Sequence, residues 1–233
     1  MFKRGKKYRK AQEKIKEQLG QASSLESLLD LVVKNASAKF DESVDADIVL
    51  GIDPTKGEQA VRGAVLLPYG RGKDVRVVAF VKGDKEEEAK QAGADYVGLD
   101  DLIEKIEKGW MDFDAAVATP DLMGKLGKIA KILGPRGLLP NKKVGTVTFD
   151  VGSVIKDLKK GRVAFKNDKG GIVHVPFGRV SFGSQKLGEN LRALIKALQA
   201  SKPASSKGKF IRKITVSSTM GVGIDINPDN IIK

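Results

Sequence analysis

The chain has 233 residues, of which 41% are hydrophobic, and this is enough for one large domain or two small ones with real cores. Its formal net charge of +13 favours a polyanionic partner, meaning nucleic acid or an anionic membrane. The absence of cysteine excludes disulfides and thiol chemistry, and a single histidine, His174, argues against a histidine-based zinc site.

The first ten residues are densely basic and contain no acid. No apolar segment follows them, so they do not form a secretory signal, and no later apolar run is long enough to span a membrane. The sequence therefore predicts a cytoplasmic protein with no membrane partner.

The next predicted elements are a helix and two strands. A helix is expected from Leu25, because Ser23 and Glu26 have the spacing of a capping box and apolar residues follow on one helical face. Apolar residues alternate from 44 to 52, which is typical of a half-buried strand. A second strand is expected over residues 61–67, before a break rich in proline and glycine.

A different pattern begins after this break. Short apolar strands are predicted to alternate with helices; the strands are at 75–81, 96–97 and 115–118, and the helices at 85–92, 100–108 and 122–133. This alternation indicates a parallel α/β sheet of the Rossmann type.

The carboxyl-terminal part is again mixed and rich in strands. Residues 162–166 and 172–175 are predicted to form a hairpin that turns at 167–171. Ser184 is expected to cap a helix whose apolar stripe runs from Leu187 to Leu198. A basic loop at 202–209 and a last strand at 210–216 follow.

The charge is divided unevenly between these parts. Residues 84–114 hold eleven acids and four lysines, a net charge of −7, so the remainder of the chain carries +20. Because one binding face would hardly be built from both, two modules are predicted. The first is a discontinuous α+β domain from residues 1–68 and 160–233, and the second is an inserted Rossmann-like α/β domain over 69–159, with hinge motion at the two linkers.

The glycine-containing loop after the last strand is the first candidate for binding RNA. Small hydroxyls and glycines let a backbone approach phosphate or ribose closely and donate N–H groups. The candidate residues are Ser217, Thr219, Met220, Gly221 and Gly223. Taken alone, the loop also fits a plain turn after a strand.

Two other basic segments are weaker candidates. Lys39 and Phe40 follow a helix end and suit a phosphate contact with stacking, although Phe40 could instead fill the core. Lys166, Asn167 and Lys169 lie at the predicted turn and could contact RNA, but asparagine and glycine are also what a turn needs.

The Rossmann-like middle raises the alternative of a nucleotide-dependent enzyme. Asp74 follows residues 70–73 where a phosphate-binding loop needs serine or threonine, and no glycine-rich fingerprint follows the strand at 75–81. His174 has no evident catalytic partner, and a structural role is expected. The sequence thus predicts no catalytic residue, metal site or cofactor. A DNA-binding regulator, which the charge alone permits, is the second alternative.

Seven stretches resemble the bacterial ribosomal protein L-one family, in family order. They are Gly5-Lys6-Lys7-Tyr8-Arg9, Ala38-Lys39-Phe40-Asp41-Glu42, Leu50-Gly51-Ile52-Asp53-Pro54, Val61-Arg62-Gly63, Leu67-Pro68-Tyr69-Gly70, Gly134-Pro135-Arg136-Gly137-Leu138-Leu139-Pro140-Asn141 and Thr219-Met220-Gly221. Some members carry threonines where this chain has Ser217-Ser218, and the hydroxyls are kept.

The resemblance implies a structural constituent of the large ribosomal subunit with the two-domain arrangement described above. It implies that the first domain binds large-subunit rRNA in the mobile stalk near the exit site, through Lys39, Phe40, the turn around Asn167 and Lys169, and the loop of Thr219, Met220 and Gly221. It also implies help in the release of deacylated exit-site tRNA and repression of translation of the protein's own operon mRNA. The expected partners are these RNAs and other ribosome components. The free protein is expected to be a monomer.

Overall fold

A computed structural model describes residues 5–20 and 24–232. The chain forms two compact units: the terminal unit (Met1–Gly72 and Val163–Lys233) and the inserted unit (Lys73–Arg162). Both units mix helices with sheets, so the predicted α/β class is confirmed. The domain boundaries at residues 68 and 160 stay a prediction, because compactness does not show independent folding.

A four-stranded sheet forms the centre of the terminal unit. Its order is β7 (Ile172–Arg179), β1 (Ser43–Leu50), β8 (Ile211–Ser218) and β9 (Ile224–Ile226), and β1 runs antiparallel to both of its neighbours. The alternation predicted for β1 is present, since every second residue from Val44 to Leu50 is buried. The sheet therefore has one core face and one face of polar side chains.

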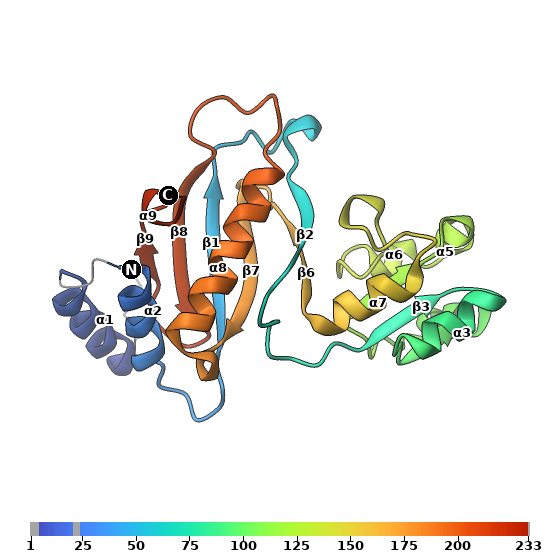
Figure 1. Ribbon diagram of the computed structural model, residues 1–233, viewed down its shortest axis with the longest axis horizontal. Helices are drawn as coiled ribbons and strands as arrows, with labels where there is room; N and C mark the ends of the chain where they lie inside the picture. Colours follow the sequence, from blue (N-terminus) through green and yellow to red (C-terminus); the bar gives the residue numbers. More distant parts are fainter. Residues whose placement is uncertain (1–4, 21–23, 233) are drawn as a thin grey trace. The chain divides into compact units, whose positions relative to one another are not determined.

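Helices cover the core face of this sheet. Figure 1 shows α2 (Leu25–Lys34) and α8 (Gly183–Ala200) on the same side of the strands, and the two helices contact each other. The predicted stripe of α8, from Leu187 to Leu198, is buried. α1 (Lys6–Leu19) packs against α2, and α9 (Asp229–Ile232) packs against α8. A two-stranded sheet of β2 (Arg62–Leu66) and β6 (Arg162–Lys166) completes the unit, with β2 against α8.

A three-stranded parallel sheet forms the inserted unit. Its order is β4 (Tyr96–Gly98), β3 (Val77–Phe80) and β5 (Ala115–Ala118). Alternate residues of β3 face two different cores: one contains α4 (Asp100–Glu107), α5 (Met123–Leu126) and α6 (Ala130–Leu133), and the other contains α3 (Asp84–Gln91) and α7 (Val151–Lys160). Helices on both faces of a parallel sheet are the Rossmann-like arrangement that was predicted.

The predicted hairpin of residues 162–166 and 172–175 is wrong. β6 pairs with β2 and β7 pairs with β1, and only an isolated bridge joins Asn167 to Val173. The turn at 167–171 therefore carries the chain from one sheet into another. The local pattern resembled a hairpin because it does not reveal which distant strand each segment joins.

Several helix boundaries also differ from the prediction. Ser24 caps α2 in a capping box with Ser27, whereas Ser23 lies outside the described residues. Ser184 is not a cap, since α8 begins at Gly183. The helix expected over 122–133 is divided into the 3-10 turn η2 (Pro120–Leu122), α5 and α6. α1, α7, β9 and α9 were not predicted, and neither were the 3-10 turns η1 (Gly57–Gln59), η3 (Lys142–Val144) and η4 (Val180–Phe182).

Candidate nucleic-acid interface

The predicted RNA-binding residues lie at two opposite ends of the four-stranded sheet. Ser43 begins β1 beside the end of β8, and the loop after β8 returns to it, because the N–H of Thr219 donates to the Ser43 carbonyl at 3.0 Å. The turn of Lys166 to Lys169 instead precedes Ile172, which pairs with Val49 near the other end of β1. Six strand residues separate the ends by roughly 20 Å. The predicted residues therefore form two surfaces.

Glu42 joins the two loops at the first end. Its carboxylate accepts the N–H of Ala38 at 2.8 Å and the N–H of Met220 at 3.0 Å, and its side chain is only 1% exposed. Burial acts to raise the pKa of Glu42, but the N–H groups of Met220 and Ala38 outweigh it and hold the pKa below its ordinary value. An ionised Glu42 thus fixes the loop of Lys39 and Phe40 against the loop of Met220.

Sequence reasoning missed Glu42, although it belongs to one of the stretches that resemble the family. One signal was present: a carboxylate directly before a strand, in a segment otherwise expected to contact a polyanion. Its partner Met220 is 178 positions away, so its role could not be read from local sequence.

The backbone N–H groups of residues 219–221, in the loop after β8, form hydrogen bonds within the protein. Thr219 and Ser43 bond reciprocally, because the N–H of Ser43 donates to the Thr219 hydroxyl at 3.1 Å, and the N–H of Gly221 donates to the Ser218 carbonyl at 3.0 Å. The expected donation of N–H groups to RNA is therefore wrong for residues 219–221. Among the hydrogen bonds of the described residues, none uses the carbonyl oxygens of 219–221, so these remain able to accept from ribose hydroxyls.

The two glycines of this loop support packing. A Cβ on Gly221 would overlap the hydroxyl of Ser218, which is 3% exposed, and a Cβ on Gly223 would lie 3.0 Å from the Thr215 methyl group. A side chain at Gly221 would thus point into the protein. The expected role of Gly221, an opening for close approach of RNA, is replaced by a role in closing the loop on Ser218.

Two exposed apolar side chains mark the outer surface of this end. Met220 is 64% exposed and Phe40 is 58% exposed, so Phe40 is not a core residue. The neighbouring Asp41 accepts hydrogen bonds from the N–H and hydroxyl of Ser181 at 3.1 and 2.9 Å, which fixes the backbone beside Phe40. We call the surface of Lys39, Phe40, Thr219, Met220 and Gly221 the Met220 end.

At the second end, the two lysines are available to contact RNA, whereas the asparagine side chain is used within the protein. The amide oxygen of Asn167 accepts the Val61 N–H at 2.8 Å, and its nitrogen donates to the Asp168 carbonyl at 2.8 Å. Asn167 therefore holds the turn, as a turn residue would. Lys166 and Lys169 are exposed, and we call this pair and its turn the Lys169 turn.

The polar face of the sheet is acidic at its centre. The Nδ1 atom of His174 lies 2.6 Å from the Asp47 carboxylate, and this hydrogen bond raises the pKa of His174 against the opposing effect of burial. Burial, together with the charge of Asp47, raises the pKa of Asp45. Ser217 is paired with Asp45 across the strands. The predicted contact Ser217 thus lies beside carboxylates, which repel a phosphate backbone.

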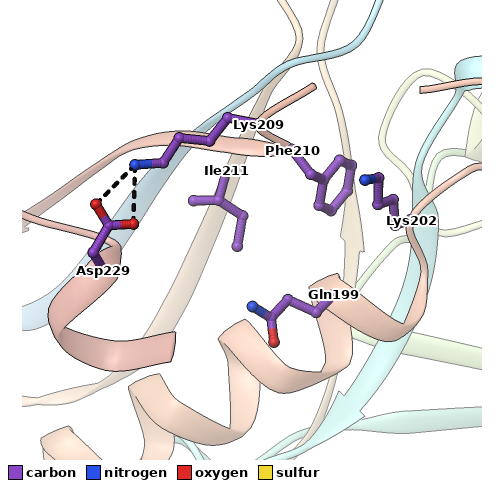
Figure 2. Close-up of a pocket in the computed structure, with 6 residues that line it drawn as sticks. All are labelled: Gln199, Lys202, Lys209, Phe210, Ile211 and Asp229. Carbon is purple, nitrogen blue, oxygen red and sulfur yellow. Dashed lines mark hydrogen bonds and ion pairs between the residues drawn. The ribbon is translucent and has the colours of Figure 1, made fainter. Parts of the chain in front are cut away.

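A pocket of about 250 Å³ (Figure 2) includes Ile211, which pairs with Leu50 at the end of β1 near the Lys169 turn. It is lined by Gln199, Lys202, Lys209, Phe210, Ile211 and Asp229. The ammonium group of Lys209 is 3.0 Å from the Asp229 carboxylate, so the charge of this lysine is compensated.

Neither a metal-holding group nor a membrane-spanning helix is present in the part of the chain that the structure describes. Residues 5–20 and 24–232 contain no group of three or more histidine, aspartate or glutamate side chains placed to hold a metal ion. Over the same residues, no helix combines the length and apolar character needed to cross a membrane.

Comparisons with a family model and with individual known proteins agree on one family. A model described as the ribosomal protein L1p/L10e family matches residues 32–222. The chain is 54% identical to the large ribosomal subunit protein uL1 of Maridesulfovibrio salexigens, covering 98% of this chain and 96% of that protein. It is 51% identical to the uL1 proteins of Desulfosudis oleivorans, covering 98% and 97%, and of Solidesulfovibrio magneticus, covering 100% and 98%.

Proposed function

Because the chain belongs to the ribosomal protein L1p/L10e family, whose members are ribosomal proteins rather than enzymes, we propose that it is a structural protein of the large ribosomal subunit that binds large-subunit rRNA through the Met220 end. The relatives carry the large subunit in their names, and the chain matches them over nearly its full length.

One observation carries the assignment to the Met220 end: a buried carboxylate, Glu42, joins two loops that display Phe40 and Met220 to solvent. An exposed aromatic ring held in a fixed position provides a stacking surface for an unpaired base, and an exposed apolar side chain beside it can pack against that base. Lys39 supplies a charge for phosphate, and the free carbonyl oxygens of 219–221 suit the ribose 2′-hydroxyl. That last preference favours RNA over the alternative of a DNA-binding regulator.

Hydroxyl-radical footprinting of large-subunit rRNA with the full chain tests this proposal. We expect one compact protected region for the wild type and its loss for the double variant Phe40→Ala/Met220→Ala. An unchanged footprint for the double variant would place the RNA contact elsewhere on the protein.

The same end is proposed to repress the protein's own operon mRNA. The Met220 end combines exposed apolar side chains, a lysine and free carbonyl groups, so the messenger site and the ribosomal site should compete for it. The ribosomal RNA must bind more tightly, and a difference of about 1.4 kcal/mol already gives a tenfold preference. A competition titration checks this, and simultaneous binding of both RNAs to one molecule would exclude a shared surface.

The Lys169 turn is proposed to contact the exit-site tRNA. It carries the exposed lysines Lys166 and Lys169 and lies at the opposite end of the strands, so it can meet a second RNA while the Met220 end is occupied. The variant Lys166→Gln/Lys169→Gln, assembled into ribosomes, should slow the release of deacylated tRNA. An unchanged release rate would count against this role.

A further inference from the structure

The inserted unit is not acidic overall, although its residues 84–114 carry a net charge of −7. It contains seventeen lysines and arginines and fifteen aspartates and glutamates. The basic residues concentrate in residues 122–149, which hold six of them and no acid. We call 122–149 the basic segment; its cations are Lys125, Lys128, Lys131, Arg136, Lys142 and Lys143.

The first half of the basic segment presents its lysines away from the core. Lys125, Lys128 and Lys131 recur every third residue along α5 and α6 and are exposed. The apolar residues between and after them, Leu126, Ile129 and Leu133, are fully buried against the sheet. Packing of the apolar row therefore fixes a row of lysines on the solvent side.

The second half is a loop held in one conformation by its own hydrogen bonds. The N–H of Leu138 donates to the Leu133 carbonyl at 3.1 Å, and the N–H of Asn141 donates to the Thr146 hydroxyl at 2.8 Å. The Asn141 side chain accepts the N–H of Lys143 at 2.8 Å. Leu138 and Leu139 pack against the core, while Arg136, Lys142 and Lys143 are exposed.

Several other lysines of the inserted unit also lack an ion pair among the described residues, but only those of the basic segment lie in a stretch without acids. Lys73, Arg76, Lys85, Lys159 and Arg162 all form ion pairs with carboxylates. In the basic segment, Lys125 is paired with Asp100 at 3.0 Å, and no ion pair of the described residues involves the other five. Five exposed charges on a fixed backbone are therefore uncompensated within the described part of the chain.

We infer that the basic segment binds the phosphate backbone of RNA, independently of base sequence, as a second RNA surface separate from the Met220 end. Cations held at fixed positions along a strand or duplex release condensed counterions when they meet phosphates. A protein partner would need an apolar centre, and the one large apolar side chain exposed among residues 122–149 is Phe149, at the end of the segment. The uncompensated charge therefore fits a nucleic-acid backbone better than a folded protein.

The test uses the full chain and an RNA duplex of unrelated sequence. The variant Lys131→Gln/Lys142→Gln/Lys143→Gln removes three cations of the basic segment. A matched control, Lys90→Gln/Lys105→Gln/Lys108→Gln, removes three exposed lysines of the same unit from its acidic helices, with the same change in net charge. Both are also made in the Phe40→Ala/Met220→Ala background, so that failure of the proposed rRNA site does not affect the outcome.

Titrations over a series of salt concentrations should separate the two variants. The basic-segment variant should bind the duplex at least about fivefold more weakly than the wild type. The slope of log K against log salt concentration should be shallower by about two, because each lost phosphate contact removes roughly 0.7–0.9 from the slope. The control should stay within about twofold of the wild type. Equal loss in both variants would overturn the inference. So would displacement of the duplex by polyglutamate at equal charge concentration, because the segment would then be a general polyanion site.

Discussion

Glu42 accepts backbone N–H groups from both loops of the Met220 end, and its charge makes these hydrogen bonds strong. Composition and local patterning identified Lys39, Phe40 and Thr219 as candidates but could not assign Glu42. Its function depends on the return of the chain to the start of β1 after β8, which is a property of the folded sheet.

Glu42→Gln should lower the free energy of unfolding by about 1–3 kcal/mol at neutral pH, because an amide N–H would face a backbone N–H. The pKa of Glu42 is lowered by folding, so its contribution is present above the ordinary value of 4.5 and is lost as the pH falls through the lower, folded pKa. Urea denaturation at a series of pH values should show the gap between wild type and variant narrowing in acid. A gap that does not change with pH would contradict this role.

Gly221→Ala should destabilise the loop because its Cβ would overlap the Ser218 hydroxyl. Adding Ser218→Ala removes the overlapping oxygen, so the double variant should be less destabilised than the sum of the two single variants. A double-mutant cycle of unfolding free energies measures this coupling. Strict additivity would show that the overlap is relieved in another way.

At the scale of elements, helices can be read from local sequence more readily than strand pairing, although the predicted caps of α2 and α8 were misplaced. α7 could have been predicted, since Asp150 caps it, Val151, Val154, Ile155 and Leu158 are buried along it, and Gly161 ends it. The partners of β6 and β7 could not, because each joins a strand more than 90 residues away, and local patterning favours the neighbour.

His174 links β7 to β1 and to the Lys169 turn, through Asp47 at 2.6 Å and Asp168 at 3.6 Å. Folding raises its pKa above the ordinary 6.5, so its stabilising effect is fully present below that value and is lost as the pH rises through the folded pKa. His174→Gln should therefore cost under about 1 kcal/mol in mild acid, as expected for an exposed pair, and almost nothing in mild alkali. Chemical denaturation at both pH values checks this, and a larger cost in alkali would refute it.

At the scale of the whole molecule, each unit has its own apolar core. One buried cluster draws only on the terminal unit, and the other two draw only on the inserted unit. The uneven charge was the basis for predicting two modules, but the net charge of residues 84–114 did not reveal the basic segment. The negative charge of residues 84–114 and the positive charge of the basic segment nearly cancel within the inserted unit. The net charge of the unit therefore does not reveal either of them.

A chain in which residues 1–72 are joined to 163–233 by a short flexible linker should fold and bind large-subunit rRNA. We expect it to lose far less than a hundredfold in affinity, about 2.7 kcal/mol, because the Met220 end is intact and only the backbone contacts of the basic segment are gone. Circular dichroism establishes folding before titration. A folded protein that binds more than a hundredfold more weakly would place the main RNA contact in the inserted unit.

The most direct test of the Met220 end is the affinity of the full chain for large-subunit rRNA in three single variants. Phe40→Ala and Met220→Ala remove exposed side chains of this end, and Leu66→Ala removes one that is 48% exposed elsewhere on the terminal unit. We predict that Phe40→Ala weakens binding about tenfold or more, given the energy of base stacking on an aromatic ring. Met220→Ala should weaken binding by a smaller factor, because its apolar contact involves no ring. Leu66→Ala should stay within about twofold, and all three variants should keep the unfolding midpoint. Equal affinities for all three variants and the wild type would contradict the assignment of RNA binding to the Met220 end.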